Sequence, residues 1–305
     1  MRATDKHTFS IVAADLAAGE VGCAVQSKYF SVGSVVPWAK AGVGAVATQA
    51  AGVAVYGPRI LALLEQGRPP DEALAEILSD DRDWETRQVG VVTAAGDAVA
   101  LTGDRCVDWA GSIVGDGFAA QGNLLAGEAV VDELARAFRE TEGPLAARLL
   151  AGLEAAQAAG GDRRGQQSAA LVVERTGAAA ETREGIDRVV DLRVDDHPQP
   201  IVELRRLYGI HERWDALRRA SGRHAARDWV RGVRILEEAL ARFPDEPPIL
   251  YDLACFESLA GDPRPALEHL SRAVELDPGY REAALADEDF AALRDDPAFR
   301  ALLGR

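Results

Sequence analysis

Apolar runs and helical patterns alternate along most of the chain. Thr8–Ala14 and Val21–Ser27 are apolar runs on either side of a turn that contains Gly19, and this predicts an opening β-hairpin. Further apolar runs, bounded by glycine and polar turns, predict strands at 42–49, 87–93, 98–102, 167–174 and 188–194. Apolar residues spaced three and four positions apart predict helices at 56–66, 70–79, 127–139, 144–158 and from 200 to about 214.

The order of these elements predicts a fold class. Strands are followed by two helices, then by strands, two helices and strands again. Helix pairs of this length cover the outer faces of two stacked sheets, whereas a doubly wound fold alternates single helices with strands. We therefore expect an α+β fold over residues 8–214, a four-layer αββα sandwich in which each sheet carries one pair of helices.

The C-terminal part of the chain follows a different pattern, a repeat. A shift of 34 residues (278 − 244 = 34) matches Leu236 with Leu270, Ala239 with Ala273, Leu240 with Val274, and Pro244 with Pro278. This is the period of tetratricopeptide repeats, which place small residues where paired helices approach and a proline at the end of each unit. We expect an all-α, tetratricopeptide-like domain at residues 222–305, which binds a peptide or protein ligand or instead forms a contact in a homodimer.

Composition narrows the class of protein. The chain has 34 basic and 49 acidic residues, a net charge of -15, and such a surface repels nucleic acid and anionic membranes. No apolar run approaches the roughly 20 residues that span a bilayer, and Met1–His7 lacks the apolar stretch of a signal peptide, so we expect a cytoplasmic protein. Cys23, Cys106 and Cys255 are far apart and in no metal-ligand spacing, so no disulfide, metal or other cofactor is expected.

Five segments of the chain resemble one known family. They are 8–13, 31–49, Tyr56-Gly-Pro, Gln121–Gly127 and Gly160–Leu171. The segments are similar to the domain-of-unknown-function 1028 family (DUF1028), and the resemblance covers roughly residues 8–210. That family is grouped by fold with the N-terminal-nucleophile (Ntn) hydrolases. Its members often end in a peptidoglycan-binding or tetratricopeptide-like tail, which residues 225–303 resemble.

The resemblance implies that Thr8 is a nucleophile. In Ntn hydrolases the first residue of the opening strand attacks the substrate, and its own α-amino group is the base. A free α-amine titrates at about 7.7 to 8.0, so it accepts and returns a proton near neutral pH. Thr8 has a free amine only after Met1–His7 is removed, by self-cleavage or by a protease. The alternative is that Thr8 only begins an edge strand.

The resemblance also suggests lysines that would lower the pKa of the nucleophile. In proteasome-like members a lysine on the third strand does this, and Lys40 begins the corresponding strand, 32 residues after Thr8 (40 − 8 = 32). Lys28, at the end of the second strand, is the rival candidate. The alternative for each is a solvated surface lysine.

Candidate substrate contacts lie in two polar segments. In the glycine-flanked loop 162–168, Asp162 and Arg163 are expected to bind substrate, Arg163 by forking onto a carboxylate, while Gln167 and Ser168 would hydrogen-bond the reacting carbonyl. A capped, salt-bridged loop is the alternative.

Two further amides complete the expected site. Asn123, after Gly122, is a candidate oxyanion donor, because glycine lets the backbone approach and asparagine offers an amide NH₂. A helix N-terminal turn explains it as well. Gln49, in the 31–49 segment, is a candidate substrate-binding residue.

Two functions follow from these residues. The first is hydrolysis of an amide or related C–N bond in a small carboxylated substrate, through an acyl-enzyme on Thr8. The second is a non-catalytic protein that uses the αββα cleft and the helical tail to recognise a ligand or protein, including peptidoglycan.

Overall fold

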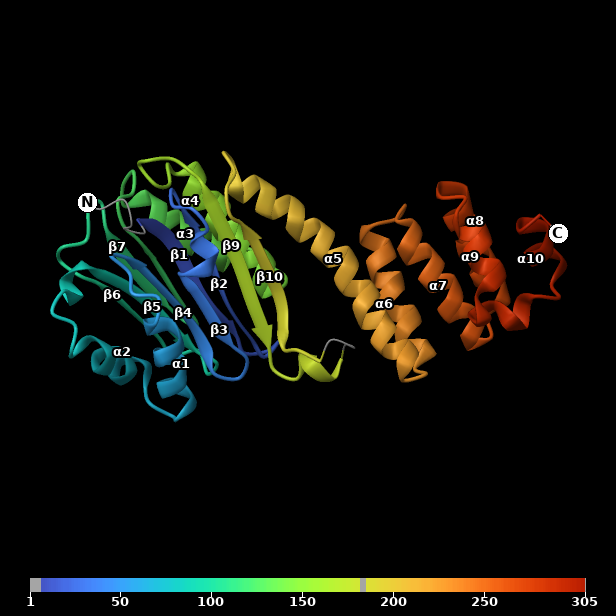
Figure 1. The fold of residues 1–305 in the computed structure, drawn as a ribbon, viewed down its shortest axis with the longest axis horizontal. Helices are drawn as coiled ribbons and strands as arrows, with labels where there is room; N and C mark the ends of the chain where they lie inside the picture. The colour runs from blue at the N-terminus through green and yellow to red at the C-terminus, as the bar shows by residue number, and fades with distance from the viewer. Residues whose placement is uncertain (1–6, 182–184, 305) are drawn as a thin grey trace. The chain divides into compact units, whose positions relative to one another are not determined.

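The structure is a computed structural model that describes residues 7–181 and 185–304. The chain forms two compact units. The first ends at Tyr208, and the second contains the residues from Gly209 onward together with the described residues of 179–185. The first unit is a mixed α+β structure with two antiparallel sheets, and the second is helical (Figure 1). Among the described residues no helix combines the length and the apolar composition that a bilayer crossing requires.

The larger sheet has six strands in the order β10-β9-β2-β1-β8-β7. Their bounds are β1 Thr8–Asp15, β2 Glu20–Ser27, β7 Gly111–Gly115, β8 Phe118–Gly122, β9 Ser168–Arg175 and β10 Arg188–Val194. The predicted hairpin forms with Thr8 opposite Ser27 and Asp15 opposite Glu20. Because β9 pairs with β2, the late strands complete the sheet that the hairpin begins.

The smaller sheet has four strands in the order β3-β4-β5-β6. Their bounds are β3 Pro37–Lys40, β4 Gly44–Ala50, β5 Arg87–Thr93 and β6 Ala98–Thr102. The strands predicted at 87–93, 98–102 and 188–194 are confirmed with the same bounds. Strands β3, β7 and β8 were not predicted. Strand β3 has only four residues, and β7 and β8 have glycine at their ends, which weakens the apolar pattern.

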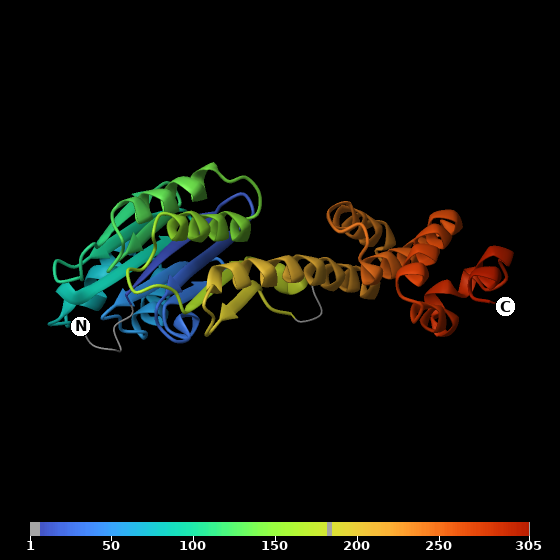
Figure 2. The same cartoon turned by 90° about the horizontal axis from the view of Figure 1, so that it is seen from above.

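Each sheet carries two helices on one face (Figure 1 and Figure 2). The bounds are α1 Tyr56–Glu65, α2 Pro70–Leu78, α3 Ala129–Glu140 and α4 Leu145–Ala158. Ile60 and Leu74 of α1 and α2 pack on β4 and β5, whereas Leu134 and Leu149 of α3 and α4 pack on the six-stranded sheet. The other faces of the two sheets meet in a third apolar cluster that includes Val12 of β1. Short 3-10 turns lie at Val32–Ser34 (η1), Trp84–Thr86 (η2) and Ala178–Ala180 (η3).

Helix α5 runs Pro200–Ala225, so the helix predicted to end at about Trp214 is longer than expected. Its first residues, such as Leu204, pack in the core of the first unit. Later residues, Ala216 and Ala220, are buried in the core of the second unit. Ala216 and Ala220 lie between the two predicted domains, 8–214 and 222–305, so the core of the second unit begins earlier in the chain than predicted.

The second unit consists of further helices. Their bounds are α6 Trp229–Arg242, α7 Pro247–Ala260, α8 Pro263–Leu276, α9 Tyr280–Ala286, η4 Glu288–Leu293 and α10 Pro297–Leu302. Both ends of α8 lie 34 residues after those of α6 (263 − 229 and 276 − 242). Leu236 of α6 and Leu270 of α8, which the repeat predicts to be equivalent, are both fully buried.

Candidate functional site

Thr8 is the first residue of β1, at the end of the six-stranded sheet where β2 ends and β9 begins. It lies opposite Ser27, the last residue of β2. Successive side chains of a strand point to opposite faces of the sheet. Because Phe9 packs against the helices of this sheet, the side chain of Thr8 points the other way, towards the four-stranded sheet. Thr8 is fully buried, and its Oγ1 donates a hydrogen bond to Ser27 Oγ at 3.2 Å.

The carbonyl group of the preceding residue, His7, accepts two hydrogen bonds. Ser27 Oγ and Arg164 Nη2 each lie 2.7 Å from the carbonyl oxygen of His7. Ser27 therefore contacts both the Thr8 hydroxyl and the carbonyl that precedes it. Donors placed on a carbonyl oxygen polarise it and stabilise the negative charge of a tetrahedral intermediate. The arrangement is suited to acyl transfer onto a hydroxyl.

Asp162 holds Arg164 in this position. Arg164 Nε lies 3.0 Å from Oδ1 of Asp162, and Nη2 lies 2.7 Å from Oδ2. The Asp162 side chain is completely buried. A bidentate pair fixes the plane of the guanidinium group. Asp162 also accepts the backbone N–H of Lys28 at 3.2 Å, so it ties this loop to the end of β2.

Asn123, directly after β8, points its side-chain oxygen towards His7. Nδ1 of His7 lies 2.7 Å from Oδ1 of Asn123. Asn123 Nδ2 donates to Gln88 Oε1 at 2.8 Å, and Gln88 Nε2 donates to the carbonyl of Gly122 at 2.8 Å. A backbone carbonyl only accepts, so this relay fixes the orientation of both amides. Asn123 thus presents an acceptor, not the amide donor that the sequence suggested; its backbone N–H donates to Thr8 O at 3.0 Å.

Gln49 belongs to a row of polar side chains between the sheets. Its members are all fully buried and comprise Ser10, Gln49, Gln88, Gln121 and Asn123. Gln49 Nε2 donates to Gln88 Oε1 at 2.8 Å and to Thr8 O at 3.3 Å, and its Oε1 accepts from Ser10 Oγ at 2.6 Å. The amide expected to bind substrate is therefore engaged by the protein itself, where it braces the end of β1.

Two residues beside this site have a left-handed backbone without being glycine. Ala50 follows Gln49 with φ 63°, and Leu124 follows Asn123 with φ 54°. This conformation costs a non-glycine residue about 1–2 kcal/mol, and such strained residues cluster at functional sites. Both strained residues adjoin side chains that contact His7 or Thr8, which supports this end of the sheets as the candidate site.

The structure does not bring Lys40 to Thr8. Lys40 ends β3 and pairs with Gly44 at the start of β4, whereas Gln49 near the other end of β4 is the residue that reaches Thr8. At about 3.3 Å per residue, these two positions on β4 are roughly 17 Å apart. Lys40 Nζ instead forms an ion pair with Glu65 at 2.6 Å, beside a cavity of about 380 Å³.

Lys28 follows Ser27, but its ammonium group is directed elsewhere. Its Nζ donates to the backbone carbonyl of Gln166 at 3.1 Å, and its side chain is exposed. Among the described residues, Arg164 rather than Lys28 or Lys40 provides a cation that contacts His7, the residue before Thr8. A guanidinium group donates in a fixed planar geometry, whereas an ammonium acts as a mobile point charge.

Arg163 is directed away from the site that its neighbour Arg164 joins. Its side chain is exposed, and Nη1 donates to the backbone carbonyl of Asp108 at 3.1 Å. Arg163 and Arg164 are the central residues of a turn, which the backbone N–H of Gly165 closes on the carbonyl of Asp162 at 2.9 Å. Of the two arginines, Arg164 reaches His7. Asp162 is likewise committed to Arg164 and Lys28 rather than to an open surface.

Gln167 and Ser168 fasten neighbouring segments. Gln167 Nε2 donates to Asp196 Oδ1 at 2.9 Å. Ser168 Oγ donates to the carbonyl of Tyr29 at 2.5 Å and accepts the backbone N–H of Val32 at 3.0 Å. These contacts lie on the far side of β2 from Thr8, because β9 is the next strand after β2 in the sheet. Both side chains therefore contact other segments of the protein, and the structure gives neither a contact with the His7 carbonyl.

Three residues of the site are not singled out in the sequence: Ser27, Gln88 and Arg164. Ser27 has a usable signal, because the predicted hairpin, continued to its ends, pairs it with Thr8. Arg164 is an arginine in the same loop as Arg163, so no sequence pattern distinguishes the two residues. Gln88 lies in an apolar strand with no motif, and only its hydrogen bonds reveal its role.

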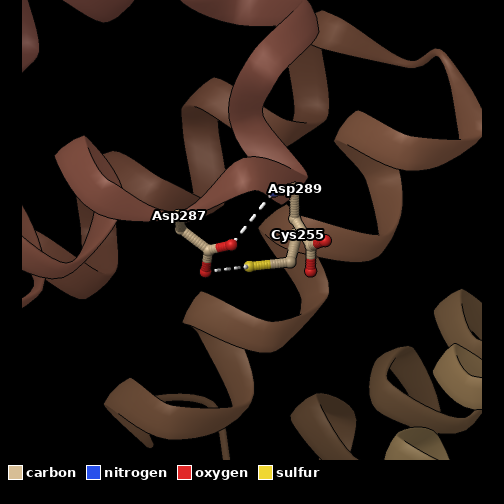
Figure 3. A group of neighbouring side chains, drawn as sticks. All are labelled: Cys255, Asp287 and Asp289. Carbon is tan, nitrogen blue, oxygen red and sulfur yellow. Dashed lines mark hydrogen bonds between the residues drawn. The ribbon is translucent and has the colours of Figure 1, made fainter.

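A second cluster of chemically active side chains lies in the helical unit. Cys255, Asp287 and Asp289 bring one ligand atom each within 4.8 Å of one another (Figure 3). Asp287 Oδ2 accepts from Tyr251 Oη at 2.9 Å and from Cys255 Sγ at 3.8 Å, and Oδ1 caps η4 through the backbone N–H of Asp289. Burial and the nearby carboxylates raise the pKa of Cys255, so the thiol is a protonated donor. The contacts therefore hold η4 on α7.

Comparison with known proteins places the first unit in a family. The model of a family of unknown function, DUF1028, matches residues 8–204. A crystal structure of protein SPO2555 from Silicibacter pomeroyi, assigned to DUF1028, is 32% identical to this chain with a TM-score of 0.60, and the match covers 67% of this chain and 88% of that one. The comparison with curated proteins found no match. The chain belongs to the DUF1028 family.

Proposed function

We propose that the first unit hydrolyses an amide or related C–N bond in a small carboxylated substrate, with Thr8 as an N-terminal nucleophile. One observation carries this proposal: the carbonyl next to the Thr8 hydroxyl accepts from Ser27 and Arg164, both at 2.7 Å. These donors are already placed where an acyl group attached to Thr8 would develop negative charge.

The arrangement of layers supports the proposal. Helices α1 and α2 cover one sheet, α3 and α4 cover the other, and the bare faces of the sheets meet. We take this as the four-layer αββα sandwich of the Ntn hydrolases, over residues 8–214. The equal offset of 34 residues at both ends of α6 and α8 supports a tetratricopeptide-like domain over residues 222–305 that binds a peptide or protein.

Each step of the proposed reaction is assigned to a residue of the site. Thr8 Oγ attacks the carbonyl carbon of the substrate, and its proton passes to the free α-amine of Thr8. Ser27 and Arg164 stabilise the oxyanion, and the α-amine returns the proton to the leaving nitrogen as the C–N bond breaks. Water then hydrolyses the ester on Thr8. Arg164 supplies positive charge at the oxyanion, which differs from the role expected of a lysine, namely to lower the pKa of the Thr8 hydroxyl.

The free α-amine requires removal of residues 1–7, of which only His7 lies within the described residues. The same donors serve this step: attack of Thr8 Oγ on the His7 carbonyl forms an ester and releases the Thr8 nitrogen, which takes the proton. Hydrolysis of that ester frees the preceding segment as a carboxylic acid. Because Ser27 and Arg164 already contact the His7 carbonyl, self-cleavage is favoured over cleavage by a separate protease.

The alternative is a binding protein without catalysis. It is favoured by the complete burial of Thr8, Asn123 and Gln49 in the full chain. A chain that keeps its first residues has no basic amine at Thr8 and no exposed hydroxyl, so only recognition would remain.

Intact-mass measurement of the purified full chain decides between these functions. We expect the mass of a chain that starts at Thr8, and we expect Thr8→Ala to keep residues 1–7. Thr8→Ser is the matched control, because it retains a hydroxyl and should still be cleaved. A wild-type chain that keeps His7 after prolonged incubation, with a folded circular dichroism spectrum, would reject the hydrolase and favour the binding protein.

A further inference from the structure

His7 is unusually well enclosed for a residue that precedes the first strand. It is 2% exposed, whereas residues ahead of a first strand are usually solvated. Three separate parts of the fold converge on it: the end of β2 through Ser27, the loop after α4 through Arg164, and the residue after β8, Asn123. The first two contact its carbonyl group and the third contacts its imidazole.

The pocket around the imidazole has a fixed hydrogen-bonding polarity. Gln88 Nε2 donates to Thr102 Oγ1 at 2.9 Å and to the carbonyl of Gly122 at 2.8 Å, so Gln88 Oε1 is the atom left to accept. Asn123 Nδ2 donates to that oxygen at 2.8 Å. Asn123 Oδ1 must then face His7, and Nδ1 of His7, 2.7 Å away, must carry the hydrogen.

We propose that the space filled by the His7 imidazole is the acyl pocket of the mature site, and that it selects acyl groups with a short side chain ending in a planar N–H donor. The inference rests on the proposed function, because the acyl group of an ester on Thr8 takes the place that His7 holds in the peptide bond to Thr8. Its carbonyl then meets Ser27 and Arg164, and its side chain meets Asn123.

The number of bonds between the carbonyl carbon and the N–H nitrogen narrows the class of acyl groups that fit. Asparagine carries its amide nitrogen as many bonds from its carbonyl carbon as histidine carries Nδ1, so both reach Asn123 Oδ1. Leucine has the shape of asparagine but no donor, and it would leave the buried Asn123 oxygen without a partner. Aspartate would place one acceptor against another. Histidyl and asparaginyl amides are therefore the expected substrates, and leucyl and aspartyl amides are rejected.

The pocket can be tested apart from any catalysis. His7→Ala combined with Thr8→Ala, the change expected to keep residues 1–7, leaves an imidazole-sized space beside Asn123, and added imidazole should bind there at pH 8. N-methylimidazole is the matched control, because it has nearly the same shape and no N–H. We expect calorimetry to show at least tenfold tighter binding of imidazole, and Asn123→Leu in the same background to abolish the difference, whereas Asn123→Asp, which keeps an acceptor, should retain it.

A second experiment measures substrate specificity in the chain that starts at Thr8. We expect kcat/KM for histidine and asparagine p-nitroanilides to exceed that for the leucine and aspartate compounds at least tenfold. Equal binding of imidazole and N-methylimidazole, or no binding of either to the folded double variant, overturns the inference. Hydrolysis without this preference also overturns it while leaving the hydrolase intact. Selective binding in a chain that never hydrolyses an amide supports the pocket and rejects the proposed function instead.

Discussion

The guanidinium group of Arg164 lies 2.7 Å from the carbonyl oxygen of His7. The contact joins a loop that follows α4 to the residue before the first strand, so the positive charge at this site comes from that loop. Asp162 is buried with Arg164 as its partner, and a buried carboxylate requires such a pairing. The pairing also holds Arg164 in place as a donor to the His7 carbonyl.

Removal of the carbonyl donors should slow both self-cleavage and turnover. We expect Ser27→Ala to lower each rate about 100-fold or more, the range seen when one oxyanion donor is lost. Arg164→Lys keeps a charge for Asp162 but loses the planar fork, and it should slow both rates while the protein stays folded. The measurements are the rate of the mass change and the initial rate of hydrolysis.

Arg163→Gln is the matched control for Arg164→Lys. Arg163 is exposed and contacts only the Asp108 carbonyl among the contacts that the structure shows for its side chain. We expect its rates to stay within about twofold of wild type, since surface contacts of this kind contribute little. A larger loss for Arg163→Gln than for Arg164→Lys would show that the wrong arginine has been placed at the oxyanion.

Lys40→Ala should leave turnover within about twofold of wild type. Its ammonium group pairs with Glu65, both side chains are about half exposed (47% and 52%), and an exposed pair contributes on the order of 0–1 kcal/mol. Lys28→Ala should have an effect of similar size, because its exposed ammonium group donates to the carbonyl of Gln166 in a loop. A tenfold loss of kcat for folded Lys40→Ala protein would instead support Lys40 as the lysine that lowers the pKa of Thr8.

Asp252 should make the stability of the helical unit depend on pH. Burial, and then the charges of Asp287 and Asp289, raise the pKa of Asp252 to about 6, whereas an unfolded aspartate titrates near 3.9. The folded unit therefore favours the protonated form, and stability falls as pH rises from about 4 to about 6. The loss is at most about 3 kcal/mol, from 1.36 kcal/mol per pKa unit.

Urea unfolding of wild type and Asp252→Asn across pH 4 to 8 tests this shift. The variant cannot ionise at this position, so its gain over wild type should be small near pH 4 and reach a plateau above about pH 6.5. Equal midpoints for the two proteins at every pH would mean that Asp252 has an ordinary pKa in the folded chain.

The helical unit should not be needed for the chemistry of the first unit. Leu204 and Tyr208 of α5 pack in the core of the first unit, whereas Ala216 and Ala220 are in the core of the second. A chain that ends at His211 should therefore be soluble, with unchanged turnover per site. A truncated chain that stays folded and loses all turnover would show that the helical unit completes the site.

Local patterns determined most of the elements. Strands such as 87–93 are visible because their residues are almost continuously apolar, and helices such as α3 because apolar positions recur on one face. The hairpin register also follows from the sequence, since the turn sets which residues pair, and that register places Ser27 opposite Thr8. The resemblance to the DUF1028 family was equally present in the residues, and the family match over 8–204 confirms it.

Tertiary structure alone decided which polar side chains meet at Thr8. Arg163 and Arg164 are neighbours of one type, and only the path of their loop directs Arg164 to His7. Asn123 was expected to donate, but a relay through Gln88 to a backbone carbonyl turns its oxygen towards His7. Both orientations depend on hydrogen bonds between segments far apart in the chain. A hydrogen bond of this kind needs one residue at one position rather than a repeated pattern, so it leaves no periodicity in the sequence.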